Sequence, residues 1–164
     1  MKKFISTIVL FSISFVSLSQ TIKISKDEFT NQIKTETSLL VLKRTFYGGI
    51  AIRGYTTDEN FVIKFSITDQ MSPTVLINSG NKVYFKLEDG NIISLENKSS
   101  ETLSKSITAR LKLSISKEDI DKMIKSPVST IRIETSDDNI DIKGFSEVKT
   151  KKLQKLLGLM RSNI

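Results

Sequence analysis

The chain has 164 residues, of which 38% are hydrophobic and 26% are charged, and it contains no cysteine, histidine or tryptophan. The absence of cysteine and histidine excludes disulfide bonds, Ser-His-Asp and Cys-His catalysis, Cys/His zinc sites and haem ligation through either residue. A chain of this length can bury roughly 70% of its unfolded surface, so a single domain needs no metal or disulfide for its stability.

The N-terminus has the pattern of a signal peptide. Two lysines precede an uncharged, mostly apolar stretch at 4–16, whereas a membrane-spanning helix needs about 20 apolar residues. Ser17 and Ser19 place small residues at the −3 and −1 positions of a cleavage site, although an uncleaved N-terminal anchor would look similar. We expect residues 1–19 to be a signal peptide and residues 20–164 to form one exported domain, periplasmic or secreted, and not transmembrane after cleavage.

The charge of the mature chain is moderately basic. Without the two lysines of the signal, 23 of the 25 basic residues remain against 18 acidic ones, a net charge of +5. Proteins that bind nucleic acids usually gather Lys and Arg on one face with aromatic or motif support, and the sequence shows neither. We expect a mildly basic, solvated surface and no nucleic-acid partner.

From Leu39 onward, apolar and polar residues alternate in short runs, which is the pattern of strands with one buried face. In the clearest run, 107–115, Leu111 and Leu113 lie on the apolar side. A fully buried parallel sheet would have continuous apolar runs, so the pattern predicts an antiparallel sheet with a solvated face. Asp89-Gly90 lies between two such runs and predicts a tight hairpin, because its turn needs positive φ.

Three stretches break this alternation and predict helices. The spacing of Ser25 and Glu28 is that of a capping box and favours a short helix over 25–34, although Thr21–Ile24 also has the pattern of a short strand. The other two helices are expected near 116–125, where Ser116 is a typical N-cap and Pro127 ends the helix, and near 146–160.

The whole pattern predicts an α+β fold dominated by β-structure. We expect a curled or doubled antiparallel sheet of seven to nine strands, with the helices near 116–125 and 146–160 packed on one face or end.

Three parts of the chain resemble a loose group of small exported proteins typical of Bacteroidota-type bacteria. They are Ser17-Leu18-Ser19-Gln20, the hairpin KVYFKLEDGNIISLEN at 82–97, and the unit ISKEDIDKMIKSPVSTIRIET at 115–135. The resemblance covers most of the mature chain and implies a periplasmic or surface location and a β-rich fold. The group has no known function, so it implies no catalytic residues.

The acidic residues give no good candidate for a metal or catalytic site. The segment 137–141 has the D-x-N-x-D opening of a calcium loop, but Ile142 stands where glycine is needed and Val148 where glutamate is needed. The pairs Asp58-Glu59 and Glu88-Asp89 would support hydrolysis only if two carboxylates met across a cleft. We expect no metal, no cofactor and no enzymatic activity.

Two groups of residues are candidates for binding a partner. The first is a face on the solvated side of the strands, which exists only if the early strands lie side by side; otherwise its members are ordinary surface residues. Its members are Tyr47, Arg53, Tyr55 and Tyr84. The second is a basic face of the C-terminal helix, which would attach to anionic lipid or an acidic polymer, or would simply be solvated. Its members are Lys149, Lys151, Lys152 and Lys155.

The sequence therefore favours an exported, non-enzymatic binding or structural module for an unidentified protein, glycan or envelope component. The alternative is a carrier or sensor of a small apolar ligand held between the sheet and the C-terminal helix. A carrier would need an enclosed cavity beneath Leu153, Leu157 and Met160, whereas a module would be packed solid there. A carboxylate-based hydrolase is the third hypothesis.

Overall fold

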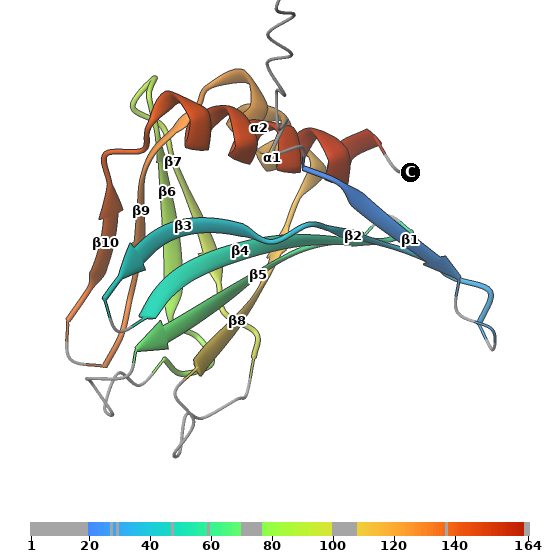
Figure 1. Ribbon diagram of the computed structural model, residues 1–164, viewed down its shortest axis with the longest axis horizontal. Helices are drawn as coiled ribbons and strands as arrows, with labels where there is room; N and C mark the ends of the chain where they lie inside the picture. Colours follow the sequence, from blue (N-terminus) through green and yellow to red (C-terminus); the bar gives the residue numbers. More distant parts are fainter. Residues whose placement is uncertain are drawn as a thin grey trace, which may run out of the picture.

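The computed structural model describes residues 20–26, 28, 30–46, 48–58, 60–69, 77–99, 108–136 and 138–162. These residues form ten strands in two antiparallel sheets, together with two helices (Figure 1). The predicted β-dominated α+β fold with a doubled antiparallel sheet is confirmed, with ten strands instead of the seven to nine expected. The predicted signal peptide lies outside the described residues.

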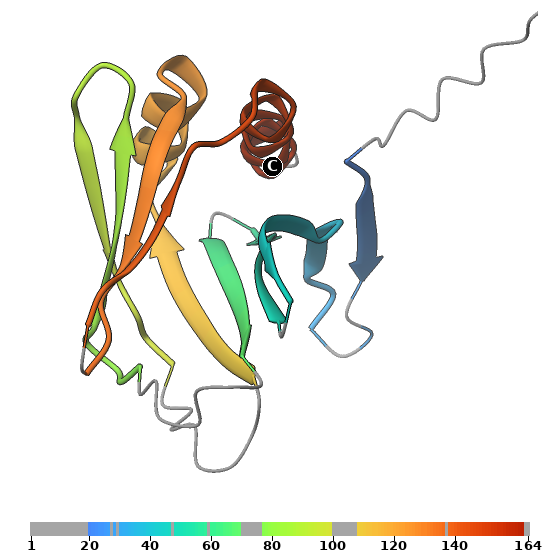
Figure 2. The same cartoon turned by 60° about the vertical axis from the view of Figure 1, so that its left-hand side comes forward.

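The first sheet has the strand order β1-β2-β4-β5-β8, and β3 pairs with β4 beside this path. Its strands are β1 (Ile22–Lys26), β2 (Ile33–Thr37), β3 (Leu40–Thr45), β4 (Gly48–Thr57), β5 (Asn60–Asp69) and β8 (Thr108–Ile115). The second sheet has the order β10-β9-β6-β7. Its strands are β6 (Lys82–Leu87), β7 (Ile92–Glu96), β9 (Val128–Ile133) and β10 (Ile140–Lys143). Figure 2 shows the two sheets beside each other, with the helices α1 (Lys117–Lys125) and α2 (Glu147–Ser162) at one end.

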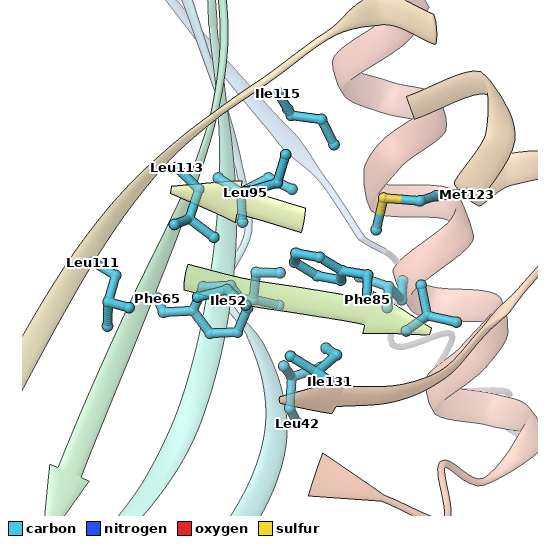
Figure 3. Packing of buried hydrophobic residues seen from close by; sticks show 14 of the residues in the cluster. Leu42, Ile52, Phe65, Phe85, Leu95, Leu111, Leu113, Ile115, Met123 and Ile131 are labelled. Atoms are coloured by element: carbon cyan, nitrogen blue, oxygen red, sulfur yellow. The ribbon is translucent and has the colours of Figure 1, made fainter. Parts of the chain in front are cut away.

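The two sheets pack through the apolar side chains that the alternation places on their facing sides. Phe65 of β5 and Phe85 of β6 are both fully buried, and their ring centroids lie 6.1 Å apart (Figure 3). Leu111 and Leu113 of β8 are also buried, on the side that the alternation predicts. The core therefore fixes which side of each strand in the first sheet faces solvent.

Helix α2 covers a further part of the buried side of the first sheet. Its apolar stripe, Leu153, Leu156, Leu157 and Met160, is buried. Gly54 of β4 lies so close to the helix that a Cβ at this position would come within 2.3 Å of the Met160 Sδ atom. The helix and the strand are thus in direct contact.

Both predicted later helices are confirmed. Ser116 caps α1 by accepting a hydrogen bond at its Oγ from the Asp119 backbone N, 3.0 Å away. The hairpin predicted at Asp89-Gly90 is also present between β6 and β7, with Gly90 at φ +89°. Within the described ranges, no helix is long and apolar enough to cross a membrane.

The helix predicted over 25–34 is wrong, and the short strand predicted at Thr21–Ile24 is confirmed as part of β1. β1 and β2 form an antiparallel pair, and Asn31 adopts the left-handed conformation, φ 58°, in the connection between them. The capping-box spacing is a local preference, whereas β2 gains hydrogen bonds by pairing with β4, and such tertiary pairing overrides propensity.

We predict that Leu156→Ala lowers the free energy of unfolding by roughly 2–5 kcal/mol, because Leu156 is fully buried beside Gly54 of β4 and its truncation leaves a cavity between α2 and the first sheet. Val148→Ala, on the same helix but 61% exposed, serves as the control and is expected to have almost no effect. Urea denaturation followed by circular dichroism measures both. Equal effects of the two substitutions would show that α2 is not docked as described.

Candidate functional site

The solvent-facing side of the first sheet carries a row of basic side chains. The register places Arg53 of β4 directly opposite Lys64 of β5, and Lys64 directly opposite Lys112 of β8. Residues directly opposite in an antiparallel pair have Cβ atoms about 4.5–5.5 Å apart. Arg53, Lys64 and Lys112, which we call the basic row, therefore cross three adjacent strands in one line.

The rest of this solvent-facing side is also basic. Among the described strand positions that the register places on it, Glu36 is the only acidic residue. The basic residues at these positions are Lys23, Lys34, Arg44, Arg53, Lys64, Arg110 and Lys112. A charge excess that is moderate for the whole chain is thus concentrated on one side of one sheet.

Local contacts hold two members of the basic row in place. Arg53 forms an ion pair with Glu36, and Glu36 also accepts a hydrogen bond from the Tyr55 hydroxyl at 3.3 Å. The Lys64 Nζ atom lies 3.8 Å from the centre of the Tyr55 ring, a cation–π contact. Burial lowers the pKa of Arg53, but its interactions with Tyr55 and Glu36 outweigh burial and raise this pKa, so Arg53 stays charged.

Two further cations of this region lie on β8. Arg110 and Lys112 are exposed on β8, and neither forms an ion pair with a described carboxylate. Their positive charges are therefore available to an anion from solution.

A hollow of about 460 Å³ lies among these cations. It is lined by Leu39, Arg53, Tyr55, Lys64, Phe65, Ser66, Ser99, Arg110, Leu111 and Lys112. The side chains of Phe65 and Leu111 are buried on the other side of the sheet, so these two residues contribute backbone to the floor, beside the small side chain of Ser66. We call this hollow the basic trough.

The basic trough runs across the strands. Leu39 lies at one end, immediately before β3, and Ser99 lies at the other end, beyond β8. Ser99 is fixed there because its Oγ donates a hydrogen bond to the Arg110 carbonyl oxygen at 2.9 Å. The trough therefore extends across β4, β5 and β8, in the same direction as the basic row.

The solvent-facing side of the second sheet has a different charge pattern. Arg132 of β9 donates two hydrogen bonds to Asp141 of β10, at 2.7 and 2.8 Å, and Lys143 lies 2.9 Å from the same carboxylate. The hydrogen bonds from Arg132 and Lys143 hold the pKa of Asp141 well below its ordinary value. At this place on the second sheet, basic side chains thus lie beside an acidic one.

Tyr84 of β6 belongs to this second surface. Its hydroxyl donates a hydrogen bond to Glu134 at 2.6 Å, which raises the pKa of Tyr84 and lowers that of Glu134. Both residues line a hollow of about 490 Å³ together with Arg132 and Lys143.

The four residues of the predicted strand face do not share one face. Arg53 and Tyr55 lie together in the basic trough, whereas Tyr84 lies on the other sheet, with the core between them. Tyr47 lies outside the described residues. The early strands do pair as that hypothesis required, since β3, β4 and β5 are neighbours, but β6 belongs to the second sheet.

The four predicted lysines of the last helix lie on α2 but have different surroundings. Lys149 donates a hydrogen bond from Nζ to the Leu42 carbonyl oxygen at 3.0 Å, and Lys151 pairs with Glu147 at 2.6 Å. Lys155 is exposed and Lys152 is half-buried. Two of the four lysines on this helix face are therefore held by contacts within the protein.

The described residues contain no group of three or more acidic side chains placed to hold a metal ion. Comparison of the chain with protein-family models, curated proteins and solved structures finds no match. The geometry and charge of the basic trough are therefore the basis for assigning a function.

We predict that the Lys112→Thr variant has a free energy of unfolding about 0.2–1 kcal/mol higher than that of the Lys86→Thr variant at low salt. The reason is that Lys112 lies directly opposite Lys64, and like charges in this arrangement destabilise a sheet. Lys86 is the control, since its cross-strand neighbours on the second sheet are Thr130 and Ile92. Urea denaturation measures both, and screening at high salt should reduce the difference. If Lys112→Thr were the less stable variant, the basic row would not be repulsive.

A second prediction concerns Asp141. Its folded-state pKa is lowered by Arg132 and Lys143, so the stability that it contributes is present above the unfolded-state pKa, about 4, and is lost as the pH falls towards the folded-state value. Asp141→Asn should therefore be less stable than the wild type at neutral pH, and this difference should shrink as the pH falls below about 4. Urea denaturation at a series of pH values measures the difference; a constant difference would contradict the ion pair.

Proposed function

We propose that this protein is an exported, non-enzymatic binding module that holds an acidic partner on the solvent-facing side of its first sheet. The basic row is the observation that carries this proposal. Three cations stand in register across adjacent strands, and Glu36 is the only acidic side chain at the described strand positions on that side.

The basic row places like charges opposite each other on neighbouring strands. Like charges directly opposite each other on neighbouring strands reduce sheet stability, and the second sheet avoids this cost by placing Asp141 beside Arg132. An acidic partner would offset the repulsion between Lys64 and Lys112 on binding. The concentrated positive potential would also accelerate the encounter with such a partner.

The packing of α2 favours a module over a carrier of an apolar ligand. Leu153, Leu157 and Met160 are buried, and Gly54 of the first sheet permits close contact with the Met160 side chain. None of the hollows at the basic trough, on the second sheet or beside β10 is lined by these three side chains.

The acidic residues at the hairpin turn favour a structural role over hydrolysis. The Asp89 carboxylate accepts a hydrogen bond from the Asn91 backbone N at 2.9 Å, which lowers the pKa of Asp89. A carboxylate held ionised in its own turn is poorly suited to act as a general acid.

We predict that replacing Lys64, Arg110 and Lys112 together by Gln weakens binding to heparin, used as a highly charged acidic probe. Cations near an anionic surface contribute roughly 1 kcal/mol each, so the expected loss is on the order of a hundredfold. The dissociation constant is measured by calorimetry at low salt.

The matched control replaces Lys86, Lys117 and Lys125 by Gln, which removes the same total charge from exposed positions elsewhere. This control should retain most of the affinity for heparin. If both triple variants lost the same affinity for heparin, binding would depend only on net charge, and the proposed site would be rejected.

A further inference from the structure

Resting on the proposed function, we infer that the acidic partner is an extended carboxylated polysaccharide that lies in the basic trough across β4, β5 and β8. The hollow reaches from Leu39 to Ser99, so it extends further than a single small anion would require. The cations of the basic row lie along the same direction.

The spacing of the cations suits a chain with regularly repeated charges. Adjacent strands lie about 4.8 Å apart, so the basic row offers a positive charge at each strand that the ligand crosses. Successive uronic acid units of a polysaccharide carry one carboxylate each, at a comparable repeat. Arg110, which is exposed and lines the trough, adds a planar guanidinium, which matches carboxylate geometry well.

The floor and ends of the trough suit sugar hydroxyl groups. Ser66 has a small side chain in the floor, directly opposite Arg110 of β8 and two positions from Lys64 along β5. Ser66, Ser99 and Tyr55 all line the trough; the hydroxyls of Ser99 and Tyr55 donate within the protein but can still accept hydrogen bonds from the hydroxyl groups of a polar chain. A chain rich in hydroxyls therefore uses groups in the trough that a purely ionic ligand would leave unused.

The aromatic content of the trough disfavours single-stranded nucleic acid. Sequence-tolerant binding of nucleic acid strands depends on aromatic rings on which bases stack. Tyr55 is the only aromatic side chain among the described residues on the trough's surface, and the Lys64 ammonium lies 3.8 Å from its ring centre. That face of the ring is therefore occupied.

A steric block tests insertion into the trough without changing its charge. Ser66→Leu fills the floor, and Ser66→Val, which suits a strand, serves the same purpose with a smaller side chain. Ser94→Leu is the matched control, because Ser94 faces solvent on the second sheet opposite Tyr84. Circular dichroism and urea denaturation establish that each variant is folded.

The probes are oligogalacturonates of increasing length, with galacturonate monomer and a single-stranded RNA of matched charge for comparison. For the wild type, affinity should rise with oligogalacturonate length and then level off once the chain spans the trough. Both Ser66 variants should bind the long oligomers at least about tenfold more weakly, a loss of about 1.4 kcal/mol, whereas Ser94→Leu should bind like the wild type.

Tighter binding of the RNA than of the oligogalacturonates, or wild-type affinity in both Ser66 variants, would overturn this inference. The proposed function would survive either result if heparin binding still depended on Lys64, Arg110 and Lys112. If the wild type bound neither heparin nor oligogalacturonates, the proposed function itself would fall.

Discussion

The structure depends on the burial of one side of the first sheet. Side chains alternate along a strand with a period of two, so burying Phe65 against Phe85 turns Lys64 and Ser66 towards solvent. A shift of one residue in the register would move Lys64 into the core, where an unpaired charge is very costly. The core therefore fixes the positions of the cations. Most residues of the basic trough lie on paired strands and not on loops.

Sequence patterns predict the structure correctly where the structural preference is local and no tertiary contact competes with it. The alternation in 107–115 correctly places Leu111 and Leu113 in the core, and Ser116 begins α1 as its cap preference indicates. The helix expected over 25–34 shows the limit of such signals. Its capping-box spacing is real, but the pairing of β1 and β2 within a sheet depends on β4, which lies further along the chain.

The candidate site could be predicted only in part. Arg53 and Tyr55 were expected on a solvent-facing side, and the structure brings both into the basic trough. Lys112 alternates with Leu111 and Leu113 and is therefore expected to face solvent, yet the sequence does not reveal that β5 pairs with β8, so the alignment of Lys112 with Lys64 could not be predicted. Both sheets show the same alternation in sequence. Strand pairing places Lys64 opposite Lys112 on the first sheet and Arg132 opposite Asp141 on the second.

The most direct test of the central claim is a map of backbone amide chemical shifts during titration with a long oligogalacturonate. We expect the largest changes at solvent-facing positions of β4, β5 and β8, including Arg53, Ser66 and Lys112, and little change at Arg132 of the second sheet. Largest changes on the second sheet or on the lysines of α2 would contradict the claim that the first sheet presents the binding surface.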